Sequence, residues 1–287
     1  MGIGNYDSAK IIHSNGKFYL LVGTSTSNRD HFYIVDAKTL YYENSAVVGA
    51  NLSGLTILNE QDGLVTGDGI RRIDLKSLNN VRIKNERLLC FYNSIIYNGK
   101  VLSNDTYKDE SKVKYYDVNE LIAAKEGEAP AVTELDIIQK QKINFVLAKD
   151  GNVYTLESAD NGCNIVKIKN DFTLEKVFAN FQPAKGPYHS SPTIGMVASE
   201  TENIIYLVST DGAIYKYILG DSDSLKAPFI AAESGVSITA PLQLNQQSGE
   251  LYVTYTEELK DESKIVVYSK DGKVLHTVDC GESVPSQ

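Results

Sequence analysis

Short runs of alternating apolar and polar residues recur along the chain, separated by turn-forming residues. A side-chain period of two predicts β-strands, because successive side chains of a strand point to opposite faces of a sheet. The runs follow one template: a turn with Gly or Asn, an apolar strand, a polar loop, a second strand that often ends in Asp, and a short turn that closes on Leu. Copies of this template begin at Asn15, Gln61, Asn98, Asp150, Glu202 and Ser248.

The spacing of the copies is typical of a β-propeller. Between Tyr19, Val65, Val101, Tyr154, Tyr206 and Tyr252 it is 46, 36, 53, 52 and 46 residues. Each copy also has an apolar stretch before its first turn and another after its closing turn, which gives four strands per copy. Four strands in a period of about 40–50 residues indicate a propeller blade. We therefore predict an all-β chain, residues 1–287, folded as a single β-propeller domain with six blades visible and seven blades as the alternative.

Two other architectures fit the pattern less well. A β-sandwich has turns at intervals but no fixed long period. Repeats of a strand and a helix require apolar residues at helical spacing, and such spacing appears only weakly, at Asn119–Lys125. We expect this piece to be a short helical insertion in the third repeat.

The stretch KDESK occurs twice, at Lys108–Lys112 and Lys260–Lys264, and the copies are 152 residues apart, about three periods. We interpret them as the same inter-strand loop on the third and sixth blades. In a blade, the turns between the first and second and between the third and fourth strands share one face. The loops between second and third strands and the links between blades share the other face. Because the latter vary most in length, we expect them to form the binding surface.

The candidate ligand-binding residues of this surface lie in its polar loops and in the link Asn180–Pro192. They are Asn28, Arg29, Asp105, Tyr107, Asp109, Tyr188, His189, Tyr255 and Glu257. Tyrosines beside a loop-rich face suit the recognition of sugars or large heterocycles, and packing at strand ends is the alternative explanation for Tyr107 and Tyr255. Loop packing is likewise the alternative for Tyr188 and His189.

Carboxylates are assigned mainly to structure. The Asp residues that end third strands, Asp36, Asp74 and Asp117, are expected to accept backbone N–H groups of the following turn. The acidic loops Asp105–Glu110 and Glu257–Glu262 have enough oxygens to suggest Ca²⁺, but they lack the EF-hand pattern and solvated charge explains them better. We therefore expect no cofactor. The three cysteines, which have no metal or disulfide spacing, are expected to be buried.

Composition excludes several classes of function. The net charge of −9, with 28 basic residues scattered among 37 acidic ones, argues against binding to nucleic acid. Apolar runs of about six residues are too short to span a membrane. The chain lacks the GxSxG, HExxH, P-loop and Rossmann motifs, and it has no Trp, which argues against quinoprotein-type propellers. We predict a non-enzymatic binding protein; the alternatives are a metal-dependent lactonase-like hydrolase and a protein-interaction propeller.

Several stretches carry a family resemblance. DAKTL and DLKSL in the early repeats, AKDGNVYTLES in the middle, and ITAPLQLNQQSGELYVTYTEE with KIVVYSKDGKVLHTVDCG at the end resemble the YncE-like β-propellers exported as bacterial surface lipoproteins. Members of that group usually have seven blades, and some capture cobalamin and pass it to a transporter.

The resemblance has consequences for location and partners. It implies a protein at the extracellular face of the outer membrane or in the periplasm, with a signal and lipid anchor that precede this sequence. It also implies nutrient capture, with a corrinoid as the small-molecule ligand and an outer-membrane transporter as the partner. A glycan is the other ligand that we expect, because of the tyrosines near the loop face. We also expect the protein to be a monomer.

Overall fold

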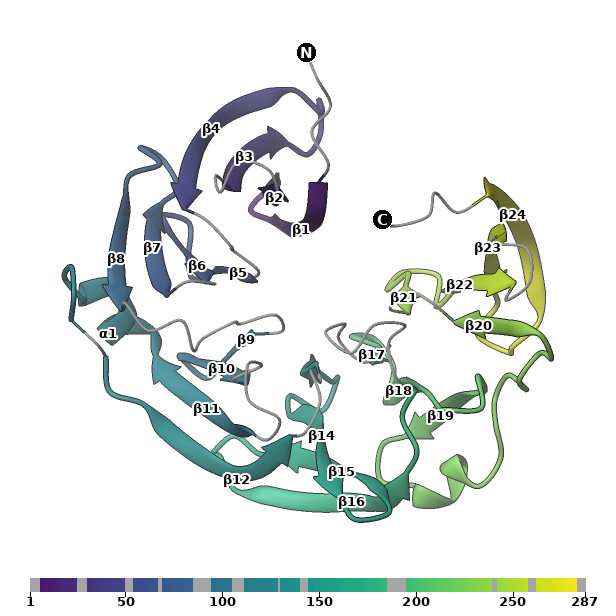
Figure 1. Ribbon diagram of the computed structural model, residues 1–287. Helices are drawn as coiled ribbons and strands as arrows, with labels where there is room; N and C mark the ends of the chain where they lie inside the picture. Colours follow the sequence, from purple (N-terminus) through teal and green to yellow (C-terminus); the bar gives the residue numbers. More distant parts are fainter. Residues whose placement is uncertain are drawn as a thin grey trace. The chain divides into compact units, whose positions relative to one another are not determined.

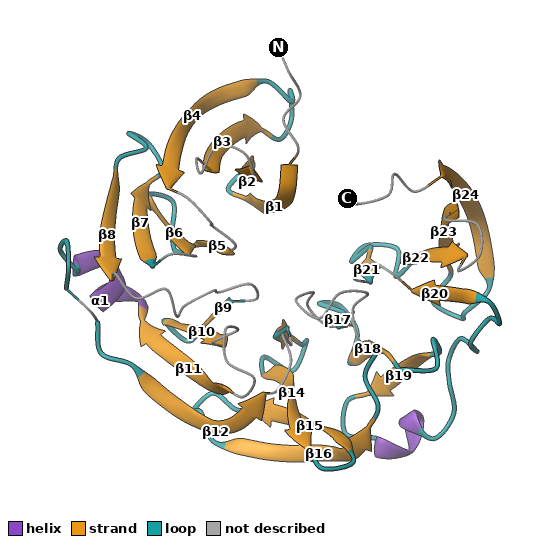
Figure 2. Ribbon diagram, viewed as in Figure 1, coloured by secondary structure: helices purple, strands orange, loops and turns teal. Residues whose placement is uncertain are grey.

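The computed structural model describes residues 6–24, 30–49, 54–66, 69–84, 94–104, 111–128, 130–139, 144–184, 195–238, 242–257 and 262–282. Nearly all described secondary structure is β-strand (Figure 2). The chain divides into two compact units, Met1–Lys140 and Gln141–Gln287. Each unit consists of three consecutive antiparallel sheets (Figure 1).

The first unit contains three four-stranded sheets in which neighbouring strands follow chain order. The first sheet is β1 (Tyr6–Ser14), β2 (Lys17–Thr24), β3 (Asp30–Asp36) and β4 (Tyr42–Gly49). The second is β5 (Gly54–Ile57), β6 (Asp62–Thr66), β7 (Ile70–Asp74) and β8 (Asn80–Lys84). The third is β9 (Ile95–Tyr97), β10 (Lys100–Asn104), β11 (Ser111–Asp117) and β12 (Thr133–Gln139), with helix α1 (Val118–Ala123) between its last two strands.

The second unit repeats this arrangement with two variations. The fourth sheet is β13 (Val146–Leu147), β14 (Val153–Ala159), β15 (Gly162–Ile168) and β16 (Leu174–Phe181). The fifth is β17 (Met196–Ala198), β18 (Ile204–Val208) and β19 (Ile214–Ile218), followed by the 3₁₀ turn η1 (Ser222–Leu225). The sixth is β20 (Val236–Ile238), β22 (Leu251–Glu257), β23 (Glu262–Tyr268) and β24 (Val274–Glu282), and β21 (Gln243–Leu244) also pairs with β22.

Six successive antiparallel sheets with short connections confirm the predicted β-propeller fold. The two KDESK copies fall at corresponding places in the third and sixth sheets, because Ser111–Lys112 begin the third strand β11 and Glu262–Lys264 begin the third strand β23. The earlier residues of both copies lie outside the described residues. The fifth sheet departs from the template, because its fourth position is reduced to a single bridge between Ile214 and Ile230. The sequence there contains Gly220 and Pro228, and Asp221 caps η1 instead of continuing a strand.

The turns show why the repeated sequence folds in this way. Asn15–Gly16 and Asn98–Gly99 join their strands with φ values between 47° and 71°, the left-handed pair that a two-residue hairpin turn requires. After the third strands, Asp36 Oδ1 accepts the backbone N–H of Lys38 at 3.0 Å and of Thr39 at 2.6 Å. Corresponding bonds form at Asp74 and Asp117. The structural assignment of these three carboxylates is therefore confirmed.

The predicted helical insertion is also confirmed, as helix α1. Asp117 caps it by accepting the N–H groups of Asn119 and Glu120. Leu121 is fully buried in a cluster between the second and third sheets that includes Leu64 and Val101. Other apolar clusters fill the spaces between the first and second, fourth and fifth, and fifth and sixth sheets. Neighbouring sheets within a unit thus pack face to face.

A side-chain amide joins the fourth and fifth sheets. Asn144 Nδ2 donates to the carbonyl of Met196 at 2.7 Å, and its Oδ1 accepts the N–H of Met196 at 3.2 Å. Gly195 is required beside it, because a Cβ at that position would overlap the Asn144 amide.

The expectation of buried cysteines is half correct for the two that are described. Cys163 is buried, and burial raises the pKa of its thiol to about 11. Cys280 is exposed, so the prediction was wrong for this residue. It lies on β24, the outermost strand of its sheet, where most side chains face solvent. Cys90 lies outside the described residues.

Among the described residues, no helix has the length and apolar character needed to cross a membrane.

The partly buried carboxylate of Asp150, whose side chain is 24% exposed, organises the first turn of the fourth sheet. Asp150 Oδ2 accepts hydrogen bonds from the Tyr154 hydroxyl and from Lys167 Nζ, both at 2.9 Å. Burial alone would raise the pKa of Asp150, but bonds from Lys167, Asn152 and Tyr154 outweigh burial and hold it below its ordinary value. The pKa values of Asp36, Asp74 and Asp117 are lowered as well, chiefly by bonds from Thr39, Ser77 and Lys100 respectively.

We expect the protein to lose stability in acid. A carboxylate whose pKa is lower in the folded state than the unfolded value of about 3.9 stabilises the fold above that value and ceases to do so as the pH falls through the folded pKa. The midpoint of thermal unfolding should therefore be flat from pH 7 to about pH 5 and fall below about pH 4. Asp150→Asn should lower stability at pH 7 by about 1 kcal/mol and flatten the acid limb. A midpoint that rises toward pH 3 would contradict this expectation.

Candidate functional site

The sequence-predicted candidates fall into two groups. Seven of them lie outside the described residues: Asn28, Arg29, Asp105, Tyr107, Asp109, Tyr188 and His189. The other two, Tyr255 and Glu257, belong to β22 of the sixth sheet.

Tyr255 lies in the core between the fifth and sixth sheets. Its side chain is 3% exposed, and its hydroxyl forms a 3.0 Å hydrogen bond with that of Tyr268. Burial and this bond raise the pKa of Tyr255, so the phenol is neutral. These contacts favour the alternative interpretation, packing at the strand end. Glu257 is the last residue of β22 and pairs with Val236 through the backbone.

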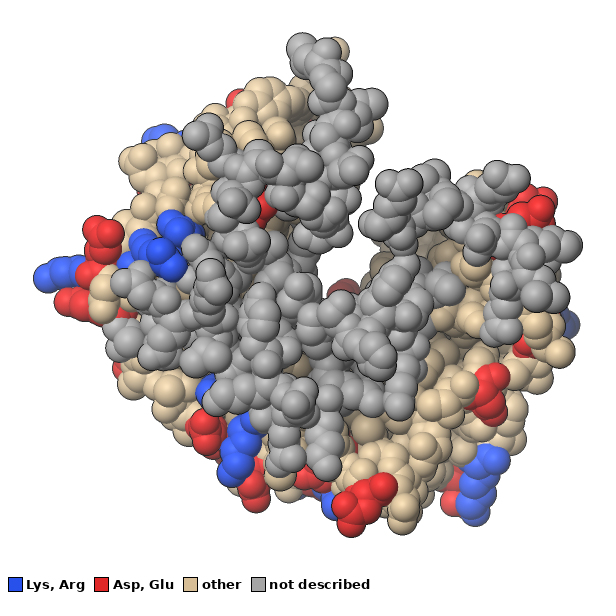
Figure 3. All heavy atoms as spheres, viewed as in Figure 1, with Lys and Arg blue, Asp and Glu red and all other residues tan. Residues whose placement is uncertain are grey.

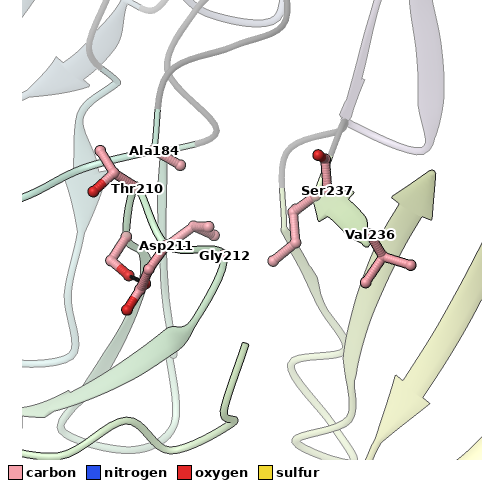
Figure 4. A pocket seen from close by; sticks show the side chains of 9 residues that line it. Ala184, Thr210, Asp211, Gly212, Val236 and Ser237 are labelled. Atoms are coloured by element: carbon pink, nitrogen blue, oxygen red, sulfur yellow. Dashed lines mark hydrogen bonds between the residues drawn. The ribbon is translucent and has the colours of Figure 1, made fainter. Parts of the chain in front are cut away.

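A cavity of about 430 Å³ lies close by, between the fifth and sixth sheets. It opens beside the turn from β18 to β19, on the face of the second-to-third-strand loops. We call it the turn cavity. Figure 4 shows Thr210 and Asp211 on one side of it and Val236 and Ser237 on the other. The described residues that line it are Ala184, Val208, Ser209, Thr210, Asp211, Gly212, Val236, Ser237 and Ile238.

Asp211 gives the turn cavity its charge. Its Oδ1 accepts the hydroxyl of Ser209 and the N–H of Ala213, the latter at 3.0 Å, while Oδ2 has no hydrogen-bond partner among the described residues. The bond from Ser209 and that from Ala213 lower the pKa of Asp211. Asp211 is therefore ionised at neutral pH, with one oxygen held by the turn and one available to accept.

The other wall is fixed by strand pairing. β20 pairs with β22, so that Ser237 lies opposite Thr256. On the wall that contains Asp211, the N–H of Ala184 donates to the carbonyl of Val208 at 2.9 Å. Ala184 belongs to the link Asn180–Pro192, and the candidates Tyr188 and His189 follow it by only four and five residues.

The chemistry of the lining selects among ligands. Val208, Val236 and Ile238 supply apolar surface, Thr210 and Ser237 supply hydroxyls, and Asp211 is an obligate acceptor. None of the described residues of the lining is Lys, Arg or His. Such a cavity suits a neutral or cationic ligand with N–H or O–H donors better than an anion. Within the described part of the chain, no group of three or more His, Cys, Asp or Glu is arranged to hold a metal ion.

A smaller cavity of about 270 Å³ lies on the other side of the same turn, between the fourth and fifth sheets. It shares Ser209, Thr210 and Asp211 with the turn cavity, and Phe181 and Gln182 form part of its far wall.

Over much of the described surface in Figure 3, acidic and basic side chains are interspersed.

Sequence reasoning identified the loop Ser209–Gly212 as part of the variable face but selected none of its residues. A weak signal was present, because an Asp two residues after a Ser and followed by Gly is typical of a tight, self-bonded turn. Ser237 carried no signal, since it lies in an ordinary strand pattern and reaches a cavity only through packing of the sixth sheet on the fifth.

Comparison with known proteins gives a family. The sequence profile of a family described as a domain of unknown function (DUF5074) matches residues 5–276. No curated protein matches the chain.

Solved structures give the fold. A quinoprotein alcohol dehydrogenase-like protein of Bacteroides thetaiotaomicron is 99% identical with a TM-score of 0.94, over 100% of this chain and 69% of that one. The Cps50 (Swd1) β-propeller domain of Myceliophteria thermophila is 11% identical with a TM-score of 0.59, over 99% and 89% of the two chains. A streptogramin B lyase is 15% identical with a TM-score of 0.55, over 99% and 86%. The last two indicate a shared fold alone.

Proposed function

Because the chain belongs to the DUF5074 family and folds as a β-propeller, we propose that it is a non-enzymatic binding protein that takes its ligand at the turn cavity. The observation that carries this proposal is the ionised Asp211, which holds one oxygen available at the mouth of a cavity of about 430 Å³. One wall is a hydrogen-bonded turn between the paired strands β18 and β19 and the other is the paired strand β20, so a ligand would meet a preformed surface and lose little binding energy to ordering it.

The ligand proposed is a molecule with an apolar body and peripheral amide or hydroxyl donors. A corrinoid has this character, because its ring is edged with amide side chains, and a glycan is the second choice. The turn cavity would hold one edge of a corrinoid, with an amide N–H donated to Asp211 and apolar surface against Val236 and Ile238. Its volume falls within the range of about 300–1,000 Å³ typical of small-molecule sites.

The proposal also includes export and delivery. The protein would be a lipid-anchored surface protein that captures a nutrient and passes it to an outer-membrane transporter. This part rests on the resemblance to YncE-like lipoproteins. The name of the Bacteroides relative refers to quinoprotein alcohol dehydrogenases, but the chain has no Trp, which favours binding over that chemistry.

Thermal unfolding with cyanocobalamin, with a set of glycans and with CaCl₂ tests the proposal. A ligand at about 100 times its dissociation constant adds roughly 2.7 kcal/mol to the stability, which should raise the midpoint by several degrees. We expect cyanocobalamin to produce such a shift.

The variant Asp211→Asn separates this site from others. The substitution keeps an oxygen for the bonds from Ser209 and Ala213 but turns the available acceptor into a donor. We expect it to weaken cyanocobalamin binding about tenfold, while Asp271→Asn, an exposed turn residue without side-chain partners among the described residues, leaves the affinity unchanged. Absence of a shift with every ligand, or equal affinities in the two variants, would disprove binding at the turn cavity.

A further inference from the structure

A third cavity, of about 500 Å³, lies in the first unit between the first and second sheets. It opens on the face of the short turns, where β1 meets β2 and β7 meets β8. We call it the lower cavity. Its lining is Asn15, Lys17, Tyr19, Ile34, Glu43, Asn44, Glu60, Leu75 and Lys76. Nothing in the proposed function uses these residues.

The hydroxyl of Tyr19, carried by a buried ring, lies in the lining of the lower cavity. Tyr19 is 2% exposed, and its ring stacks on Phe32 with 6.1 Å between centroids. Its hydroxyl has no hydrogen-bond partner among the described residues. Burial raises the pKa of Tyr19, and the neighbouring Lys17 only partly offsets this, so the phenol is neutral and can both donate and accept a bond.

Other sheets of the same protein show how this hydroxyl is normally satisfied. Tyr154 of the fourth sheet donates to Asp150 at 2.9 Å, and Tyr252 of the sixth sheet donates to Glu250 at 3.2 Å. In both, the acid comes from the turn that precedes the strand. The corresponding turn of the first sheet reads Asn15–Gly16–Lys17 and contains no acid. The first sheet therefore presents a tyrosine hydroxyl without the internal acceptor that its counterparts in the fourth and sixth sheets have.

The fifth sheet provides a further comparison. Tyr206 also forms no hydrogen bond among the described residues, but its ring packs against Phe229 with 5.5 Å between centroids, and it lines none of the three cavities. The combination of an unpartnered hydroxyl and a cavity is thus particular to Tyr19 among these tyrosines.

The charges of the lower cavity cancel. Lys17 Nζ contacts Glu43 Oε2 at 2.7 Å, and this bond raises the pKa of Lys17. On the opposite wall, Glu60 and Lys76 have no ion-pair partner among the described residues. With two ammonium groups and two carboxylates, the lining favours neither an anion nor a cation. The amides of Asn15 and Asn44 add donors and acceptors, and Ile34 and Leu75 add apolar surface.

We propose that the lower cavity is a saccharide-binding site. Sugar hydroxyls donate and accept at once, so vicinal hydroxyls match a lining in which ammonium, carboxylate and amide groups alternate. The apolar face of a sugar ring would lie against Ile34 and Leu75. The Tyr19 hydroxyl bonds to a sugar oxygen at the base of the site, which supplies the partner that the turn lacks. The site is separate from the turn cavity and does not depend on it.

Titration calorimetry of the full chain tests the proposal with glucose, galactose, mannose, N-acetylglucosamine and the β-1,4 and α-1,4 disaccharides of glucose as probes. We expect at least one sugar to bind saturably, with an affinity that does not change with salt. Tyr19→Phe should weaken it about tenfold. The matched variant Tyr252→Phe also removes one tyrosine hydroxyl and should leave the affinity unchanged.

Two further measurements keep the result unambiguous. Tyr19→Phe breaks no internal hydrogen bond, so its unfolding midpoint should equal that of the parent protein, which removes misfolding as an explanation. Asp211→Asn should bind the sugar as the parent does, which separates this site from the turn cavity. The proposal is overturned if none of the probes binds, or if Tyr19→Phe binds as tightly as the parent.

Discussion

Replacing Leu121 with Ala is expected to lower the free energy of unfolding by about 2–5 kcal/mol. Leu121 is fully buried although it comes from a helix of only six residues. It packs among residues of the second and third sheets, including Leu64, Ile70 and Tyr116. Truncation removes the transfer free energy of its methyl groups and leaves a space that strands on both sides cannot readily fill.

Urea denaturation followed by circular dichroism measures this effect. Leu147→Ala is the matched control, because Leu147 is 45% exposed and its truncation should change stability by less than about 0.5 kcal/mol. A loss below 1 kcal/mol for Leu121→Ala would contradict this prediction. It would mean that the helix contributes little to stability and that the apolar cluster packs equally well without the Leu121 side chain.

Replacing Gly162 with Ala should destabilise the protein by about 3 kcal/mol. Gly162 has a φ of 123°, a region that side chains rarely adopt. A Cβ there would lie 2.5 Å from Gln182 Nε2 and 2.6 Å from the carbonyl oxygen of Phe181. The second contact is with backbone, so relief requires β15 and β16 to separate.

Gly151→Ala is the control for backbone strain alone. Gly151 also has a left-handed φ, of 74°, but a Cβ there meets nothing within 4 Å, so the expected loss is about 1 kcal/mol. Equal losses for the two variants, again by urea denaturation, would rule out the close contact as the cause. Gly162→Ala should also weaken ligand binding, because the Gln182 carbonyl accepts the N–H of Thr210 at 2.9 Å and so positions the turn beside both cavities of the second unit.

The repeated parts of the fold could be read from the sequence because local chemistry determines them. Asn15–Gly16 specifies a hairpin turn by its conformation, and Asp36 and Asp74 specify the next turn by hydrogen bonds to residues two and three positions ahead. The helix at Val118–Ala123 was indicated by the weak helical spacing at Asn119–Lys125. Each of these depends on neighbours in sequence, which is why a single sequence was enough.

The sites depend on packing between sheets, which sequence patterns do not report. Tyr255 lies near a polar loop in sequence, yet its ring points into the space between two sheets. Ser237 lines a cavity only because β20 packs beside the fifth sheet. The hydroxyl of Tyr19 differs from that of Tyr154 through one position in the preceding turn, Asn15 in place of Asp150. That difference is visible in the sequence, but its meaning appears only when both rings are known to be buried.

The amide of Asn144 has a consequence for how the sheets of the second unit are aligned. Apolar surfaces are attracted to one another without direction, so two sheets held by side-chain packing alone can slide along their strands at modest cost. Asn144 binds the N–H and the carbonyl of a single residue, Met196, and a slide of one residue would bring neither group to it. The two hydrogen bonds of this one side chain therefore form in a single alignment of the fourth and fifth sheets, and intermediate alignments lose both bonds.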